Sequence, residues 1–279
     1  MLMRKIKKVL KWLGAMLLVF VISFLGTAAA NDSLSVDQIL TGTKQIVSLS
    51  ENQVSQENSL SQGIDAMESN STLNRLERIF FLKQAVNARI NSANYVKLQD
   101  IPESLQQAVV AVEDRKFYNH CGFDMEGIFR ASLVNLQYGQ VREGASTITQ
   151  QLVKNLFLSQ EQTMGRKAEE FVLAMDMELN YSKDEILELY LNTIYFGSGY
   201  YGIKEASEGY FGKEPAMLAL PESAMLAGIP NAPSLYSPYV DFMLAKKRQF
   251  IVLDAMTAAG YLRESVADDA KIKPIYLAH

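Results

Sequence analysis

Residues 144–155 read GASTITQQLVKN, a string of hydroxyl and amide side chains set among strongly apolar segments. A second polar string, EDRKFYNHCGFD, occupies residues 113–124, and a third, RKAEE, occupies residues 166–170. A packing core does not need carboxylates, cations and amides gathered within so short a stretch of chain. The three strings together therefore predict a site for an anionic, hydroxyl-bearing substrate.

The segments around these strings carry apolar residues at helical spacing. Ser182 followed by Glu185 is the pattern of a capping box, and Gly228 has the place of a helix C-terminus. An alternating, strand-like pattern is confined to residues 146–149. The predicted fold class is therefore mainly α. Helices are expected over residues 102–113, 166–181, 183–191 and 221–228, with a last amphipathic helix over residues 245–259.

Charge and length exclude some classes of protein. The 279 residues carry a net charge of −4, although five cations lie within the first eleven residues. The acidic remainder argues against general nucleic-acid binding, which needs an extended basic face. Cys121 is the single cysteine of the chain, so no internal disulfide is possible. The chain is long enough for one catalytic domain with appendages.

The N-terminus predicts export. Residues 12–30 contain no charged side chain, a run long enough to cross a hydrocarbon core of about 30 Å. The preceding basic residues predict a cytoplasmic N-terminus, so residues 1–30 are interpreted as a stub and a single transmembrane anchor. A cleaved signal peptide ending near Ala28–Ala30 is the alternative. Residues 31–72, rich in Ser, Asn and Gln, are predicted to be a polar spacer, and residues 73–279 the functional domain.

Glu113 ends an apolar helical stretch and is followed directly by Asp114. Partial desolvation there would raise the pKa of Glu113 and suit a general base. Helical neighbours point about 100° apart, so the two carboxylates cannot serve one reacting atom equally. One is expected to be catalytic and the other structural. In the alternative, both are surface charges paired with Arg115 and Lys116.

The remaining polar residues can be interpreted either as functional groups or as ordinary surface and capping residues. Arg166, Lys167 and Glu170 fall within one helical turn, where a surface salt bridge is the simpler interpretation. Lys154 could equally be a surface lysine, and the hydroxyls and amides of residues 146–151 could be a cap and a polar face. His120 with Cys121 has no second His/Cys pair, so no protein metal cluster is predicted.

Taken in order, the motifs resemble those of the peptidoglycan glycosyltransferases, either monofunctional enzymes or the glycosyltransferase domain of class A penicillin-binding proteins. The resemblance runs from about Tyr95 to Met256. It rests on the three strings above, on Ile186-Leu187-Glu188 through Tyr190-Leu191-Asn192 to Tyr195-Phe196-Gly197, and on Glu222 with Leu226-Ala227-Gly228, Pro233, Tyr236 and Pro238.

The resemblance implies a lysozyme-like, two-lobed α fold that polymerises lipid II into β-1,4-linked glycan strands. Undecaprenyl pyrophosphate would be released with inversion at the anomeric carbon. Glu113 would be the general base, and Glu170 would act at the donor pyrophosphate or at its divalent metal ion, Mg or Mn. The substrate-binding residues would be Asp114, Arg130, Ser146, Gln150, Lys154, Arg166 and Lys167. The expected partners are lipid II, the growing strand, the cell membrane and cell-wall synthesis proteins, with the catalytic domain extracytoplasmic.

There are two departures from the family pattern, of which the first bears on donor binding and the second is a local structural matter. Gln162 stands where the family commonly has an arginine that contacts pyrophosphate, and no proline precedes the last helix near Asp241. The printed chain has no Ser-x-x-Lys followed by Lys-Thr-Gly, so we expect a monofunctional enzyme that penicillin does not acylate. The alternatives are a glycan-cleaving muramidase, which the basic residues disfavour, and an inactive scaffold that binds lipid II.

Overall fold

The computed structural model describes residues 81–138, 146–158 and 164–278. The chain divides into two compact units, one of residues 1–82 and 161–169 and the other of residues 83–160 and 170–279. The first unit contributes only residues 81–82 and 164–169 to the described part. The predicted membrane anchor, the polar spacer and Gln162 lie outside the described residues.

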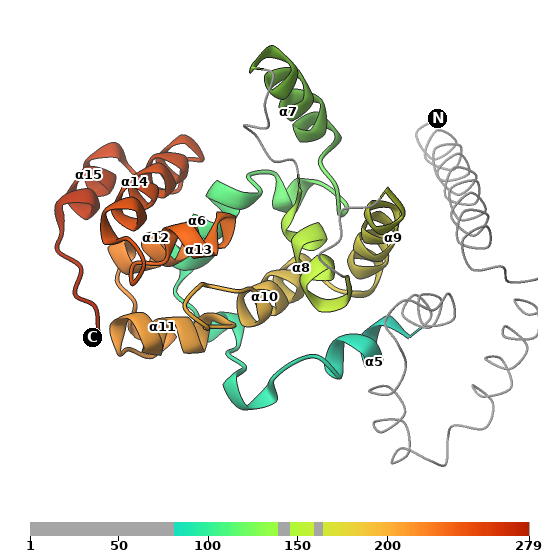
Figure 1. Cartoon of the computed structure of the whole chain (residues 1–279), viewed down its shortest axis with the longest axis horizontal. Coiled ribbons are helices and arrows are strands. Elements are labelled where there is room, and N and C mark those ends of the chain that lie inside the picture. The colour runs from blue at the N-terminus through green and yellow to red at the C-terminus, as the bar shows by residue number, and fades with distance from the viewer. Residues whose placement is uncertain (1–80, 139–145, 159–163, 279) are drawn as a thin grey trace, which may run out of the picture. The chain divides into compact units, whose positions relative to one another are not determined.

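Helices dominate the described residues (Figure 1). The one β feature among them is an isolated antiparallel bridge between Tyr195 and Tyr201. The mainly α class is thereby confirmed, while the lysozyme-like, two-lobed arrangement stays a prediction. The helices are α5 (Leu82–Asn87), η1 (Ser92–Asn94), η2 (Leu98–Asp100), α6 (Glu103–Glu113), η3 (Phe117–Asn119), α7 (Met125–Tyr138), α8 (Ile148–Phe157), α9 (Met164–Asn180), α10 (Lys183–Thr193), α11 (Ile203–Phe211), η4 (Pro215–Met217), α12 (Leu220–Gly228), η5 (Ile229–Asn231), α13 (Pro233–Tyr236), α14 (Phe242–Ala258) and α15 (Glu264–Ile272).

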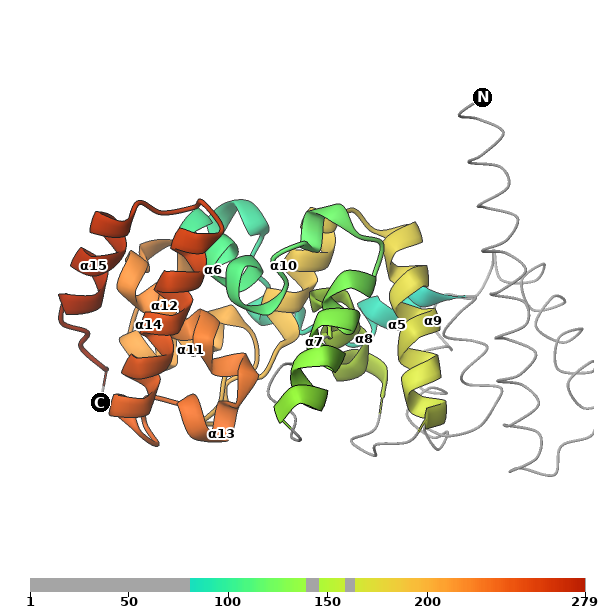
Figure 2. The same ribbon diagram turned by 90° about the horizontal axis from the view of Figure 1, so that it is seen from above.

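Helix α12 is the centre of the second unit, because its residues 221–228 are all buried. A helix that is apolar on every side is stable only when neighbours surround it. Helices α6 and α14 both pack against α12 and against each other, and Figure 2 shows α14 running alongside α12. This packing brings the C-terminal end of α6 and the middle of α14 into one region, although more than a hundred residues separate them.

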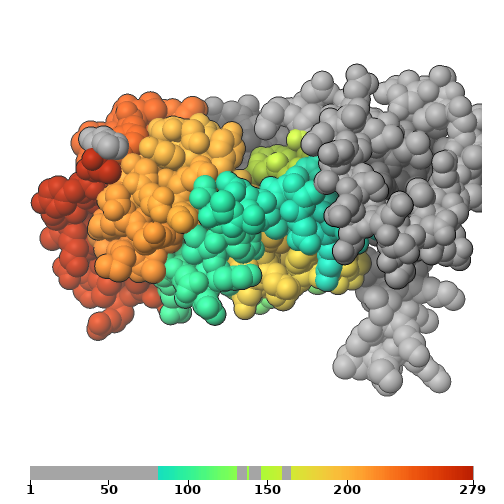
Figure 3. Space-filling view, turned by 90° about the horizontal axis from the view of Figure 1, so that it is seen from below, coloured from blue at the N-terminus to red at the C-terminus, as the bar shows by residue number. Residues whose placement is uncertain are grey.

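Helix α10 has two roles in the packing. One side lies against α8, and another side lies against η2. Glu188 accepts hydrogen bonds from the hydroxyl of Tyr95 at 2.8 Å and from the backbone N–H of Leu98 at 2.8 Å. Asn192 holds the same segment through both backbone groups of Val96. Residues 95–98, before α6, are thus bound to α10 by Glu188 and Asn192, on the face of the molecule that Figure 3 shows. Another side of α10 packs against α8.

The helix boundaries confirm some predictions and correct others. The capping box at Ser182 is present, and α12 ends at Gly228 as expected. Helix α14 begins at Phe242, earlier than predicted, because the Asp241 side chain accepts from Leu244 N at 2.9 Å and caps it. This cap serves where the family pattern has proline. Helix α15 follows α14, so the prediction that α14 would be the last helix was wrong.

Within residues 81–138, 146–158 and 164–278, no helix combines the length and the apolar character needed to cross a bilayer.

Candidate active site

Glu113 is the last residue of α6, and its side chain is only 6% exposed. Its Oε2 accepts a hydrogen bond of 2.8 Å from the Nε2 of Gln151 on α8. Its Oε1 lies 4.0 Å from the Nη2 of Arg248 on α14. Three helices that are distant in sequence therefore converge on one carboxyl group.

Burial raises the pKa of Glu113 above its ordinary value, and the charge of Asp114 acts in the same direction. The Gln151 hydrogen bond and the charges of Arg248 and Lys154 oppose that rise. A raised pKa makes a carboxyl group bind a proton more readily, and the opposing charges and hydrogen bond favour its ionised form. These are the properties of a general base. The influence of Lys154 on Glu113 is consistent with the predicted base and the predicted phosphate-binding lysine sharing one region.

Asp114 has a different environment from its neighbour. It is buried, and both carboxylate oxygens lie 2.9 Å from the Nε2 of His120. Its Oδ2 also accepts the backbone N–H of Ile148, in the first turn of α8, at 3.1 Å. A carboxylate at this end of a helix satisfies an otherwise unpaired N–H and complements the helix dipole. Asp114 therefore joins α6 to the start of α8, and its role in binding substrate stays a prediction.

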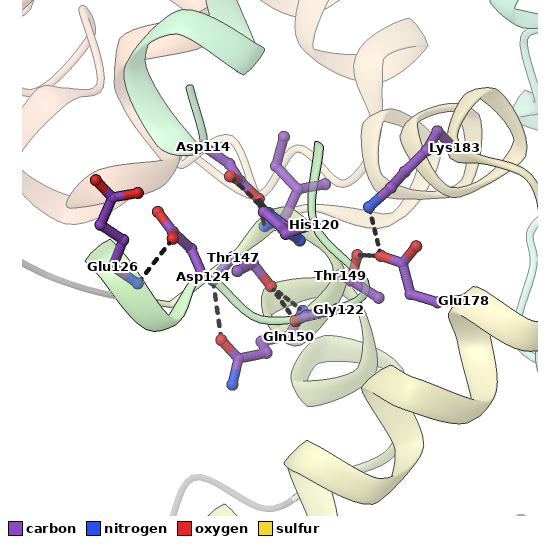
Figure 4. A network of polar contacts seen from close by, with 11 residues as sticks. Asp114, His120, Gly122, Asp124, Glu126, Thr147, Thr149, Gln150, Glu178 and Lys183 are labelled. Atoms are coloured by element: carbon purple, nitrogen blue, oxygen red, sulfur yellow. Dashed lines mark hydrogen bonds and ion pairs between the residues drawn. The ribbon is translucent and has the colours of Figure 1, made fainter. Parts of the chain in front are cut away.

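The start of α8 is held by a capping box that uses Thr147 and Gln150. The Thr147 hydroxyl accepts from Gln150 N at 3.1 Å and donates to the carbonyl of Gly122 at 2.7 Å (Figure 4). The Gln150 side chain in turn accepts from Thr147 N at 3.0 Å. The structure thus places Gln150, which the resemblance assigned to substrate, in the cap. Ser146, just before the cap, is exposed.

Gln151 is the amide that contacts Glu113, whereas the sequence prediction named its neighbour Gln150. Helical geometry offered a signal, because Gln151 lies three residues before Lys154 and so shares a face of α8 with it. Gln151 also accepts a hydrogen bond of 3.1 Å from the hydroxyl of Tyr190 on α10. The sequence placed Tyr190 in one of the motifs of the resemblance but assigned it no role at Glu113.

Arg248 was also missed, because only the packing of α14 against α6 brings it to Glu113. Its Nε donates to the carbonyl of Gly228 at 3.4 Å, and its guanidinium lies 5.5 Å from the ring centre of Tyr236. Gly228 leaves the space for this side chain, since a Cβ there would lie 2.7 Å from the Cγ of Arg248. The cation is therefore supported on two sides.

The other predicted residues lie on α7 and α9. Arg130 is exposed on α7. Arg166 and Lys167 belong to the first compact unit, whereas Glu170, on the same helix, belongs to the second and is 2% exposed. Helical spacing puts Glu170 on the face of Arg166, one turn later. That these three groups act with Glu113 stays a prediction.

The described residues contain no group of three or more His, Cys, Asp or Glu side chains able to hold a metal ion by themselves. Mg²⁺ commonly takes one or two carboxylates and completes its shell with substrate phosphates and water. A single buried carboxylate such as Glu170 is compatible with an ion that arrives with a diphosphate.

The fold and this site define an α-helical protein with a buried carboxyl group that lies near an arginine and is influenced by the charge of a lysine. A family model described as Transglycosylase matches residues 82–257. The chain therefore belongs to the transglycosylase family.

Several penicillin-binding proteins are similar to this chain. Penicillin-binding protein 1A of Aquifex aeolicus (strain VF5) is 45% identical over 181 residues, which are 65% of this chain and 25% of that protein. Penicillin-binding protein 1A of Neisseria gonorrhoeae is 49% identical over 176 residues, 63% of this chain and 22% of that protein. For penicillin-binding protein 1F of Bacillus subtilis (strain 168) the values are 44%, 176 residues, 63% and 25%.

A solved structure is also similar, the 2.6 Å crystal structure of penicillin-binding protein 1A from Haemophilus influenzae. It matches with a TM-score of 0.41 and 26% identity, over 66% of this chain and 18% of that chain. The matches to the three penicillin-binding proteins of Aquifex aeolicus, Neisseria gonorrhoeae and Bacillus subtilis each span about a quarter of the relative's length, or slightly less.

Proposed function

We propose that this protein is a peptidoglycan glycosyltransferase that polymerises lipid II into β-1,4-linked glycan strands. Undecaprenyl pyrophosphate is the leaving group, and the anomeric carbon is inverted because the acceptor attacks it directly. The observation that carries the proposal is the buried Glu113 carboxyl group, held by Gln151 and acted on by the charges of Arg248 and Lys154. Membership of the transglycosylase family supports it.

In this mechanism Glu113 takes the proton of the acceptor 4-hydroxyl as that oxygen attacks the donor. A diphosphate leaving group needs little protonation, so cations can replace a general acid. The charge of Lys154 acts on the base together with that of Arg248, and Arg130, Arg166 and Lys167 are proposed to supply further positive charge along the diphosphate. Ser146, Gln150 and Asp114 are assigned to the edge of the same site.

A divalent ion, Mg or Mn, when bound with the diphosphate, would supply additional charge stabilisation, and Glu170 is the residue proposed to hold it. The substrate is lipid-linked, so the domain is proposed to work at a membrane, and the basic residues that precede the apolar run of residues 12–30 favour a single N-terminal anchor with the domain outside the cell. Cell-wall synthesis proteins are proposed as its further partners.

The test is incubation of the purified full-length chain with fluorescently labelled lipid II, with and without a divalent metal ion. We expect strands that lengthen with time. Shortening of finished glycan would instead favour a muramidase, and tight lipid II binding without turnover would favour a scaffold.

Glu113→Gln should lower polymerisation by at least about a hundredfold, the usual contribution of a general base, and leave the far-ultraviolet circular dichroism unchanged. The matched variant is Glu214→Gln, which alters an exposed carboxylate before η4. It should polymerise at the wild-type rate. Near-normal turnover by Glu113→Gln would remove Glu113 from the role of base.

A further inference from the structure

A chain of two hydrogen bonds leads from α10 through α8 to the end of α6. The Tyr190 hydroxyl donates to Gln151 Oε1 at 3.1 Å, and Gln151 Nε2 donates to Glu113 Oε2 at 2.8 Å. All three side chains lie in the second compact unit. Tyr190 is fully buried, so its hydroxyl keeps this contact away from competing water.

The chemistry of the three groups fixes the direction of the chain. An ionised carboxylate can only accept hydrogen bonds, so it selects the NH₂ side of the Gln151 amide. The amide oxygen then faces Tyr190 and needs a donor. Burial raises the pKa of Tyr190 well above its ordinary value, with the charges of Glu113 and Asp114 adding to the effect. The phenol therefore keeps its proton and supplies that donor.

The two oxygens of Glu113 are consequently not equivalent. Oε2 is committed to Gln151, whereas Oε1 is buried and accepts no hydrogen bond from any described residue. The nearest cation, Arg248 Nη2, is 4.0 Å from Oε1, which is beyond hydrogen-bond distance. Among described donors, Oε1 therefore keeps both of its lone-pair sites free, whereas Oε2 uses one of its two for Gln151.

We propose that Tyr190 is a positioning residue, which acts through Gln151 to hold Glu113 Oε2 and to reserve Oε1 as the atom that receives the acceptor proton. The assignment rests on the proposed function. In the step, the acceptor O–H bond breaks and an Oε1–H bond forms. The electron pair left on the acceptor oxygen makes the new bond to the anomeric carbon, whose bond to the diphosphate breaks with its pair leaving on the diphosphate.

Removal of the Tyr190 hydroxyl should raise the pKa of Glu113, although the hydroxyl does not contact Glu113 directly. In Tyr190→Phe the amide oxygen of Gln151 loses its donor, so only the hydrogen bond to Glu113 still opposes a 180° turn of the amide, and the turned amide becomes more populated. An amide oxygen facing Glu113 favours the protonated acid, which can donate to it. The acid limb of the pH–rate profile should therefore move to higher pH.

The experiment measures kcat and KM for lipid II against pH in the full-length chain. Tyr190→Phe should lower kcat about tenfold near neutral pH, the equivalent of one hydrogen bond, with KM nearly unchanged and the acid limb displaced upward. Tyr210→Phe is the matched control. Its hydroxyl is also buried, but it donates to Phe196 O at 2.9 Å and contacts Ser237, so the acid limb should stay in place.

A double-mutant cycle shows whether the effect passes through Gln151. Gln151→Leu alone should displace the acid limb upward, and addition of Tyr190→Phe should displace it no further. Additive displacements, or an unmoved limb in a folded Tyr190→Phe variant, would overturn the proposal. If Tyr190→Phe does not fold, Gln151→Leu carries the test alone, and an unmoved limb in that variant is equally decisive.

A measurement without substrate separates this proposal from the proposed function. Infrared difference spectra between the wild type and Glu113→Gln isolate the carboxyl stretch of Glu113, whose titration can be followed in an inactive protein. Upward displacement of that titration in Tyr190→Phe supports the positioning role even where lipid II is not polymerised. Displacement in Tyr210→Phe of the same size, or none in Tyr190→Phe, contradicts it.

Discussion

Two adjacent carboxylates acquire different chemistry from their surroundings. Asp114 binds His120 and the first turn of α8, so its negative charge is used for architecture. Glu113 has one hydrogen bond and a nearby guanidinium, and burial raises its pKa. Asp114 is the C-cap of α6 and has already left the helix, so the end of the helix separates the two carboxylates, and not the step of about 100° that the sequence argument used. The argument could not say which neighbour was which without the packing of α8.

Arg248 should tune the base from a distance. Its charge lowers the pKa of Glu113, so Arg248→Met should raise that pKa. Because the base works only when ionised, activity is present above this pKa and is lost as the pH falls through it. The acid limb of kcat/KM should therefore move to higher pH, with a loss of about tenfold near neutrality.

Two further variants make the Arg248 prediction specific. Arg248→Lys keeps a cation, so its acid limb should lie close to the wild-type position. The two-sided support of the guanidinium is lost in this variant. Lys247→Met removes the exposed charge next along α14 and should leave the profile unchanged. Equal profiles for Arg248→Met and the wild type would show that Arg248 serves packing alone.

At the scale of elements, α8 carries Gln151 and Lys154, and its first turn is fixed from three directions. These are the capping box, the Thr147 bond to Gly122 O, and the bond from Ile148 N to Asp114. Helix α10 begins with a capping box of the same type at Ser182, but that one is exposed. The pair offers a comparison between a cap beside the site and a cap away from it.

Thr147→Ala should lower the free energy of unfolding by about 2 kcal/mol, since it removes the cap and leaves the buried Gly122 carbonyl without its donor. Ser182→Ala should cost only about 1 kcal/mol. Chemical denaturation measures both. Turnover of lipid II under conditions where both variants are folded should fall only for Thr147→Ala, and equal turnover would mean that the start of α8 does not position the site.

Helix boundaries could be predicted from the sequence more readily than the contacts between helices. Capping residues act locally, so the Ser182 box and the end of α12 at Gly228 could be identified from spacing. Gln150 and Gln151 differ by one position on α8, and only the place of α6 decides which of them meets Glu113. Arg248 and Tyr190 reach the site through contacts between helices far apart in the chain, which single-sequence periodicity does not encode.

For the whole molecule, burying an acid that must ionise is a cost to stability. The folded-state pKa of Glu113 is raised, so the folded protein binds the proton more tightly than the unfolded chain does. The resulting destabilisation is absent below the unfolded value of about 4.3. It grows as the pH rises towards the folded pKa and is complete above it. A residue kept for chemistry is therefore expected to weaken the fold at neutral pH.

Glu113→Gln should therefore raise the melting temperature at pH 7 to 8, because a neutral amide needs no desolvation of charge and can still pair with Gln151. The expected gain is a few degrees, roughly what 1 kcal/mol produces in a domain of this size. The gain should shrink as the pH falls. It should be nearly gone near pH 4, where the Glu113 carboxyl group of the wild type is mostly protonated in both the folded and the unfolded protein. Glu214→Gln, at an exposed position, should change the melting temperature little at either pH. A wild type more stable than Glu113→Gln at pH 8 would show that Arg248, Lys154 and Gln151 together outweigh the desolvation of the carboxylate, and the fold would then be adapted to a charged Glu113 more fully than its burial implies.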